Sequence, residues 1–358
     1  MPSLLAILFV ISLFSAPVAA AERTAFLVHS DKLWSASAGG DVQEVPIAFE
    51  RTESDSKLGT TAPVVSPDQR RAAFAMENDL WIQDLKTGAR EKVTRHGRAE
   101  SDEYASVYVL VTAWSPDSKS VLYQVTHGET EDAEGHQAEK QVRPVEYGAH
   151  VYDVDKKRSR AVALAGDFQA WLPDGRVVLT SSEPELLVKA LLVQKLDSDM
   201  PERLVPDRGL WGQADVSPDG RWILISLGQQ GPKPADPNEE PPLVSRIVKV
   251  DVQNGKLVDV TTPGSWSEFQ MPRFSPSEKQ TAWIRQGEPD ASGFSKAALI
   301  VDGKERGQFD LPVEYRWITD DAIAVAHLDD IDVVRASDGA RIGGRKIAEP
   351  ADQQSLLR

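Results

Sequence analysis

The chain has 358 residues, of which 41% are hydrophobic and 27% charged, a balance that excludes a wholly disordered protein. Its net charge of −15 disfavours non-specific binding to nucleic acid or anionic lipid, because a phosphate backbone repels a surface of this sign. The sequence has no cysteine, which excludes disulfides, thiolate metal sites and a cysteine nucleophile.

The first 21 residues predict an export signal. An apolar run over residues 4–14 is followed by small residues up to Ala20 and Ala21, where signal peptidase cleavage is expected. No Lys or Arg precedes the run, so an uncleaved anchor is the alternative, since the uncharged stretch approaches the ~20 residues that span a bilayer. We therefore expect a periplasmic or secreted protein with a signal peptide at 1–21, one domain at 22–358 and no membrane span after cleavage.

A unit of apolar strand, tight turn and apolar strand recurs along the rest of the chain. Its clearest turn is Ser217-Pro218-Asp219-Gly220, in which proline suits the second position of a type I turn, aspartate the third and glycine the fourth. Further copies lie at residues 65–68, 114–117, 171–175 and 274–277, with a degenerate copy at 317–321. Repetition at intervals of roughly 45–55 residues predicts a propeller or another repeat array.

The predicted strands are short, β-prone segments bounded by turn residues, and they fall into groups. The first group, at 25–46, lacks its first strand, and four-stranded groups follow at 63–94, 107–164, 168–205, 213–261, 271–311 and 315–347. Insertions at 128–148 and 228–245 interrupt two of them. If residues 354–358 supply the missing strand, the fold is an all-β propeller of four-stranded blades with seven blades, six being the alternative, and the closed ring has no exposed sheet edge.

The repeat, with the hairpin LWIQDLKTG at Leu80–Gly88, resembles the WD40-like repeats of TolB-type propellers and of the N-terminal propeller of dipeptidyl peptidase IV-like proteins. The resemblance covers nearly all of the mature chain and implies a fold more than a function. TolB-like proteins bind a peptidoglycan-associated lipoprotein and other envelope partners, although the α/β domain before their propeller has no counterpart here. We also expect no peptidase activity, because no hydrolase domain follows the last repeat and no Gly-x-Ser-x-Gly elbow occurs.

One face of such a propeller is the predicted binding surface. The connections between second and third strands share this face with the connections between blades, and loops on a rigid scaffold commonly carry binding sites. The residues predicted for this binding face are His96, Glu103, Tyr104, His127, His136, Tyr147, Trp211 and Trp266.

Three residue patterns could indicate a specific site, but each also has a simpler structural explanation. The acidic segment 127–136 contains carboxylates and imidazoles that suit a divalent cation, but it lacks the spacing of a metal motif, so we predict a solvated loop, with no metal ligand and no cofactor. The turn aspartates are predicted to bond the local backbone. The tryptophans before the turns, at 114, 171 and 317, are predicted to fill the space between blades, with ligand stacking as the alternative.

These observations favour a monomeric propeller that binds an envelope protein or peptide and catalyses no reaction. The alternative is a metal-assisted polysaccharide lyase or hydrolase with a cleft on the loop face, because some TolB-like propellers that this chain resembles use a histidine-bound metal.

Overall fold

The computed structural model describes residues 23–30, 32–47, 63–76, 79–95, 105–129, 147–181, 189–232, 241–265, 269–287, 296–311, 313–328 and 330–347. All regular elements in these ranges are β-strands, and every pair is antiparallel. No helix with the length and hydrophobicity of a membrane span occurs in the described part of the chain.

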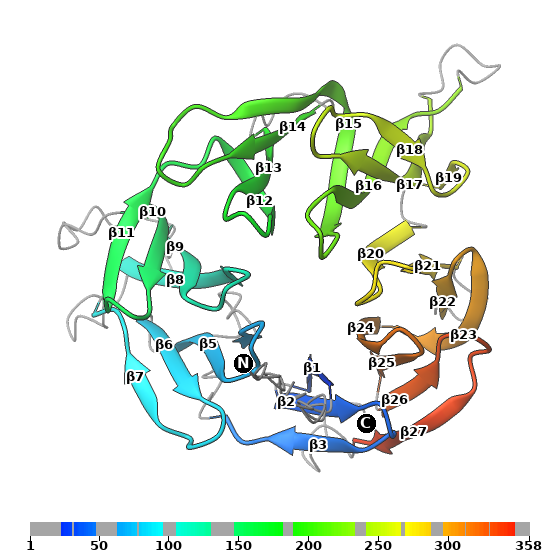
Figure 1. Ribbon diagram of the computed structural model, residues 1–358, viewed down its shortest axis with the longest axis horizontal. Helices are drawn as coiled ribbons and strands as arrows, with labels where there is room; N and C mark the ends of the chain where they lie inside the picture. Colours follow the sequence, from blue (N-terminus) through cyan, green and yellow to red (C-terminus); the bar gives the residue numbers. More distant parts are fainter. Residues whose placement is uncertain are drawn as a thin grey trace, which may run out of the picture.

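The strands form antiparallel sheets arranged around a common centre (Figure 1). The first sheet has three strands, β1 (Thr24–His29), β2 (Lys32–Ser37) and β3 (Val42–Val45). The second has β4 (Val64–Val65), β5 (Arg71–Met76), β6 (Asp79–Asp84) and β7 (Arg90–Lys92). The third has β8 (Ala105–Trp114), β9 (Ser120–Glu129), β10 (Gly148–Asp153) and β11 (Arg158–Val162).

An eight-stranded sheet comes next in the chain. It contains β12 (Gly166–Trp171), β13 (Val177–Ser181), β14 (Lys189–Gln194), β15 (Glu202–Val216), β16 (Trp222–Gln230), β17 (Leu243–Asp251), β18 (Leu257–Asp259) and β19 (Gly264–Ser265). The last two sheets have four strands each. They are β20 (Phe269–Phe274), β21 (Thr281–Gln286), β22 (Lys296–Val301) and β23 (Lys304–Asp310), then β24 (Val313–Thr319), β25 (Ala322–His327), β26 (Asp330–Arg335) and β27 (Arg341–Lys346). The predicted all-β propeller with four-stranded blades is confirmed.

The second strands of the sheets are buried on both faces. Strands β5, β13, β21 and β25 each contain at least four consecutive buried residues. Such strands read as continuous apolar runs instead of alternating patterns, because neighbouring sheets cover both of their faces. This explains why the repeats are visible in the sequence.

Two boundaries differ from the prediction. The connector expected at 206–212 is part of β15, which pairs with β14 up to Gly209 and with β16 from Leu210 onward, so two predicted blades share one strand. The insertion expected at 228–245 begins inside β16 and ends inside β17, where Gln230 pairs with Leu243. In both places the chain stays extended because an antiparallel neighbour pairs with it.

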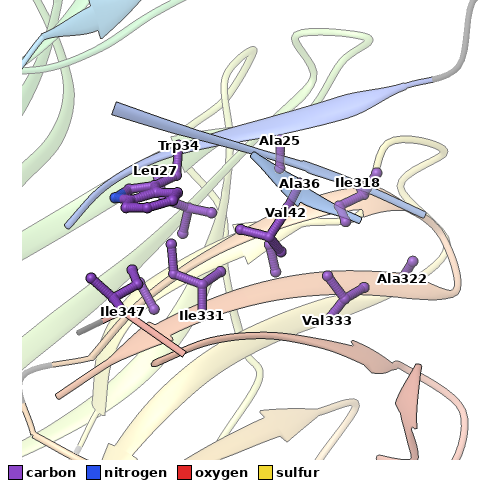
Figure 2. Packing of buried hydrophobic residues seen from close by; sticks show 12 residues of the cluster. Ala25, Leu27, Trp34, Ala36, Val42, Ile318, Ala322, Ile331, Val333 and Ile347 are labelled. Atoms are coloured by element: carbon purple, nitrogen blue, oxygen red, sulfur yellow. The ribbon is translucent and has the colours of Figure 1, made fainter. Parts of the chain in front are cut away.

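The first and last sheets pack against each other. Leu27 and Trp34 of the first sheet share a buried apolar cluster with Ile331 and Val333 of the last sheet (Figure 2). Ile347, the last residue described, belongs to the same cluster. The two ends of the described chain therefore meet.

Backbone contact between Gly40 and Gly343 completes this junction. A Cβ atom on Gly343 would lie 2.6 Å from the Gly40 Cα. Two hairpins can approach this closely only because neither residue has a side chain.

The free edge of β1 borders a cavity of about 380 Å³. Phe26 and Val28 of β1, Val64 of β4 and Trp317 of β24 line it. The predicted closing strand at 354–358 lies outside the described residues, and this cavity is where a first strand of the β1–β3 sheet would lie.

Candidate binding site

Most of the predicted binding face lies outside the described part of the structure. The residues concerned are His96, Glu103, Tyr104, His136 and Trp266. The backbone of His127 lies in β9 opposite Val107, but its side chain is not described. The acidic segment 127–136 is therefore untested as a metal site, and the described residues elsewhere contain no group of three His, Asp or Glu that could hold a metal ion.

Tyr147 and Trp211 are the two members of that face with described side chains. Tyr147 directly precedes β10 and is 45% exposed. Trp211 is 8% exposed and packs in an apolar cluster, and its Nε1 donates a hydrogen bond to the Lys189 carbonyl oxygen at 2.7 Å. The loop face as a binding surface stays a prediction.

The Ser-Pro-Asp turns lie at the opposite end of the sheets, which we call the turn face. In a four-stranded meander the turn between strands one and two and the turn between strands three and four are at the same end. In the turn at 115–118, the Ser115 hydroxyl donates to Asp117 Oδ1 at 2.6 Å, and Asp117 Oδ1 accepts from the Lys119 N–H at 3.1 Å. The Ser115 hydrogen bond lowers the pKa of Asp117, so this carboxyl is ionised at neutral pH.

The same pattern recurs in the other turns. Ser217 donates to Asp219 at 2.6 Å, and Ser66 donates to Asp68 at 2.6 Å. The Asp174 carboxylate accepts from the Arg176 N–H at 3.1 Å. The predicted backbone-bonding role of the turn aspartates is confirmed.

Hydrogen bonds join several neighbouring turns across the boundary between sheets. In three of them the N–H of the third turn residue donates to a side-chain oxygen of the next sheet's turn. These bonds are Asp68 N–H to Ser118 Oγ at 2.9 Å, Asp219 N–H to Glu278 Oε1 at 2.5 Å, and Ser277 N–H to Asp320 Oδ1 at 2.9 Å. At the first junction, Gln69 Nε2 donates to the Thr24 carbonyl oxygen at 2.7 Å.

In two of these three bonds the acceptor lies at the fourth turn position. Ser118 and Glu278 occupy this position with φ of 60° and 63° and supply the accepting oxygens. Gly175 and Gly220 occupy it in their turns and have no side chain to offer. The two glycines nevertheless have different surroundings.

Gly220 is in tight contact with the preceding turn. A Cβ atom there would lie 2.9 Å from Pro173 Cδ, so the two turns pack directly. A Cβ atom on Gly175 would have no neighbour within 4 Å. The junction between the β8–β11 sheet and strands β12–β14 is therefore open at the turn face.

A groove of about 610 Å³ lies at this open junction. Pro116 and Asp117 of one turn line it on one side, and Pro173 and Gly175 of the next turn line it on the other. Strands β10 and β11 and strands β12–β14 are neighbours in the ring (Figure 1, left and upper left). The groove is thus built by two adjacent sheets.

The floor of the groove is apolar. Val151, Trp171 and Leu196 line it and belong to one apolar cluster between the two sheets. The prediction that tryptophans fill the space between blades fits Trp114, whose Nε1 donates to the Val64 carbonyl oxygen at 2.8 Å. Trp171 packs edge-on against Phe168 and also lines the groove, and its buried Nε1 has no acceptor among the described residues.

The groove also carries cations that lack a carboxylate partner. Arg158 and Arg160 lie on β11 and line it. Arg160 donates to the Leu196 carbonyl oxygen at 3.1 Å, which leaves its charge uncompensated, and Arg158 has no partner in the described part of the chain. By contrast, Lys157 projects toward the other neighbouring sheet and pairs with Glu91 at 2.9 Å.

The remaining charged groups at the groove are already engaged. Lys156 pairs with Asp153 at 2.6 Å, and Asp174 pairs with Arg176 at 2.8 Å. Among the described groups, the charges without an ion-pair partner at the groove are therefore the two arginines on β11 and the Asp117 carboxylate, which accepts from a hydroxyl and a backbone N–H. The sequence-based prediction did not include this groove, because Gly175 shares its fourth turn position and positive φ with Gly220, whose junction is closed.

A second polar cluster lies on innermost strands of three sheets. Asp215 of β15 accepts from the Phe274 N–H of β20 at 2.8 Å, and burial raises the pKa of its carboxyl against the opposing charge of Arg273. Tyr315 of β24 donates to the Met271 carbonyl oxygen of β20 at 2.7 Å. Each bond joins neighbouring sheets, so this cluster contributes to the structure of the ring.

Known proteins resemble the chain in fold. The family model for the dipeptidyl peptidase IV N-terminal region matches residues 20–126. No curated protein matches the sequence. The chain is thus similar to the propellers of the TolB and dipeptidyl peptidase IV N-terminal type, as its repeats predicted.

Three solved structures are among those that match. TolB from Acinetobacter baumannii aligns with 79% of this chain and 62% of its own, at 17% identity and a TM-score of 0.47. Dipeptidyl peptidase 4 from Porphyromonas gingivalis aligns with 93% and 51%, at 12% identity and a TM-score of 0.47. Oligogalacturonate lyase in complex with manganese aligns with 80% and 76%, at 11% identity and a TM-score of 0.49. The chain thus spans about three fifths of the TolB chain and half of the peptidase chain, and these similarities assign no function to it.

Proposed function

We propose that the protein is an exported, non-catalytic propeller that binds a protein or peptide of the cell envelope through the groove on its turn face. The observation that carries this proposal is the open junction beside Gly175, because the other neighbouring Ser-Pro-Asp-type turns that the structure describes are bonded or in contact. A gap between two sheets that is lined by charged and apolar side chains is a place for a ligand.

The size and lining of the groove support binding. Ligand pockets commonly have volumes of about 300–1,000 Å³ and combine apolar walls with a few polar groups. The groove has about 610 Å³, an apolar floor and two arginines that pair with no carboxylate in the described part of the chain. Trp and Arg are also the residues most enriched among the strongest contributors to protein interfaces.

The charge of the groove differs from that of the whole chain. The protein has a net charge of −15, so most anionic molecules are repelled at long range. The groove is lined by three cations, Lys156, Arg158 and Arg160, and three carboxylates, Asp117, Asp153 and Asp174, so it lacks the negative excess of the whole chain. The site therefore favours a specific anionic partner over non-specific polyanions.

The acidic residues of the groove do not suit catalysis. The Asp117 carboxyl has a lowered pKa, so at neutral pH it holds no proton to donate as a general acid. Asp153 and Asp174 are paired with cations. These engaged carboxylates favour binding over acid catalysis in this groove, whereas the lyase or hydrolase alternative concerns a cleft on the loop face.

Export and a monomeric state rest on the sequence. The signal segment at 1–21 and the single domain at 22–358 place the mature propeller outside the cytoplasm in this proposal. TolB-like proteins, which the repeats resemble, bind envelope proteins, and we extend only the general role of protein binding to this chain.

The test is affinity capture from an envelope extract with the mature chain. We compare it with the double variant Arg158→Ala/Arg160→Ala and with a variant whose segments 130–146 and 233–240 are replaced by short turns. Lys157→Ala is the matched control, because this neighbouring cation projects toward the other sheet. Loss of one captured protein in the arginine variant alone supports the groove.

The opposite pattern of capture would contradict the groove as the binding site. If capture survives the arginine changes and disappears with the shortened segments, the binding surface is the loop face that the sequence predicts. Circular dichroism of each variant checks that the propeller remains folded.

We also infer that the ring has seven blades and that residues 354–358 pair with β1. Ile347 packs beside the first sheet, and the cavity along the β1 edge has room for a strand. Removal of residues 348–358 should then lower the melting temperature. An unchanged melting temperature would argue against this closing strand.

A further inference from the structure

We propose that the groove receives the C-terminal carboxylate of a peptide or protein, with the Asp117 N–H as its backbone donor. This inference rests on the proposed binding function and adds the chemistry of the group that is recognised. It follows from a comparison of the turns within this one chain.

Equivalent N–H groups in three other turns each have an oxygen partner. The partners are the Ser118 hydroxyl, the Glu278 carboxylate and the Asp320 carboxylate, at 2.9, 2.5 and 2.9 Å. Two of these three acceptors are carboxylates. In these three turns, an acceptor oxygen lies next to the N–H of the third turn residue. A carboxylate oxygen can occupy this position.

At the 115–118 turn, no side chain of the next turn supplies the oxygen. The next turn has Gly175 at the position of Ser118 and Glu278, and the space around its Cα is open. Asp117 itself lines the groove. A ligand oxygen can therefore take the place that Glu278 Oε1 has beside Asp219.

The carboxylate of Asp117 does not prevent this. In the 217–220 turn, the Asp219 side chain makes the same hydrogen bond to its serine, and the Asp219 N–H still binds the Glu278 carboxylate. Two carboxyl groups are thus accommodated around one such turn, in hydrogen-bond contact with each other. The second turn serves as a structural precedent for the first.

Arg158 and Arg160 supply the compensating charge. Guanidinium groups pair with carboxylates through two parallel hydrogen bonds, and charge-assisted bonds are about twice as strong as neutral ones. Both side chains line the groove and neither has a carboxylate partner among the described residues. They can therefore bind an incoming carboxylate without first breaking an ion pair.

The apolar floor decides which carboxylate is expected. Val151, Trp171 and Leu196 lie in the same groove as the two arginines. A C-terminal apolar residue presents a carboxylate and an apolar side chain together, which an Asp or Glu side chain does not.

Three synthetic peptides test the inference by calorimetric titration of the mature chain. They are acetyl-Gly-Gly-Leu with a free carboxylate, the same peptide as its amide, and acetyl-Gly-Glu-Leu amide. We expect the free acid to bind at least tenfold more tightly than either amide. Equal binding of the acid and its amide would overturn the carboxylate assignment, and equal binding of the Glu-containing amide would overturn the C-terminal one.

Substitutions locate the carboxylate within the groove. Gly175→Glu adds an internal carboxylate at the position of Glu278 and should weaken binding of the acid at least tenfold. Gly175→Ala is its matched control, because it imposes the same backbone cost without an oxygen and should bind nearly as well as the parent. Arg158→Gln should weaken binding and Lys157→Gln should not, which keeps the proposal testable if a change at position 175 impairs folding.

Amide NMR provides a readout at the proposed donor. The Asp117 N–H resonance should shift downfield on titration with the acid and stay unchanged with the amide. If Arg158→Ala/Arg160→Ala abolishes capture of an envelope protein while all three peptides fail to bind, the binding function stands and the C-terminal carboxylate is wrong.

Discussion

The β8–β11 sheet has one closed and one open junction with its neighbours. Toward the β4–β7 sheet, the Asp68 N–H binds Ser118 and the Lys157 ammonium binds Glu91. Toward strands β12–β14, the corresponding turn has Gly175, and the cations Arg158 and Arg160 have no carboxylate partner among the residues that the structure describes. At the fourth turn position the closed junction has Ser118 and the open junction has Gly175.

The comparison shows how a repeated structure acquires a unique site. The repeats supply the same turn many times, and each copy presents the same backbone N–H. In the turn beside Asp117, Gly175 has no side chain that could accept such a bond. If the proposed groove binds a ligand, its site arises from a missing side chain and not from an inserted loop.

The first prediction breaks the tightest closed junction. Gly343→Ala would place a methyl group 2.6 Å from the Gly40 Cα, where backbone atoms cannot rotate away. We expect the free energy of unfolding, measured by guanidinium denaturation, to fall by about 3 kcal/mol or more. Gly39→Ala is the control, since its nearest neighbour would be 3.7 Å away. Similar stability of the two variants would show that the ends of the ring are not in tight contact.

The second prediction weakens a closed junction near the ring centre. Tyr315→Phe removes the buried hydroxyl that donates to the Met271 carbonyl oxygen of the neighbouring sheet. Leaving that carbonyl unsatisfied should lower the free energy of unfolding by about 1–3 kcal/mol. Denaturation curves that superimpose on those of the parent chain would contradict a bond between these sheets.

The third prediction exchanges the fourth turn residues of the closed and the open junction. Ser118→Ala removes the acceptor of the Asp68 N–H at a position that is 4% exposed, and should cost about 1 kcal/mol. The reciprocal change, Gly175→Ser, gains a similar bond but forces a serine to φ near 86°, so its net effect should be within about 0.5 kcal/mol. Thermal unfolding of the Ser118→Ala and Gly175→Ser variants measures both changes in stability. A large loss in the reciprocal variant would mean that the two turns are not interchangeable.

The smallest effect concerns pH at the open turn. The Ser115 hydroxyl holds the pKa of Asp117 below its usual value of about 3.9, so this carboxylate stabilises the fold above that pH. The contribution is lost as pH falls through the lowered pKa. Ser115→Ala should raise the Asp117 pKa toward the usual value, as measured by NMR titration of the side-chain carboxyl. If the Asp117 titration midpoint does not change in this variant, a group other than the Ser115 hydroxyl lowers the Asp117 pKa.

Local chemistry made the fold predictable from sequence. The Ser-Pro-Asp turns determine their own geometry, because the serine, the aspartate and the following N–H groups bond within a few residues. Apolar runs of strand length then mark the buried strands. The shared strand β15 was missed because Pro206, Gly209 and Gly212 read as a connector, whereas pairing on both sides keeps the chain extended.

The groove depends on contacts that the sequence does not display. Gly175 and Gly220 look alike in the chain, and both adopt positive φ. Only the position of Pro173 against one of them, and of open space beside the other, separates their roles. Loop length directed the sequence-based prediction to the opposite face, most of which lies outside the described residues.

The contact between Gly40 and Gly343 has a consequence for the order of folding. It joins segments about 300 residues apart, so it forms only after nearly the whole chain is available. Until then the apolar side of the β1–β3 sheet, with Leu27 and Trp34, has no partner sheet to cover it. A chain that emerges from its amino end must therefore keep its earliest sheet from aggregating until the last sheet arrives, and transient protection by a chaperone would matter most for this first segment.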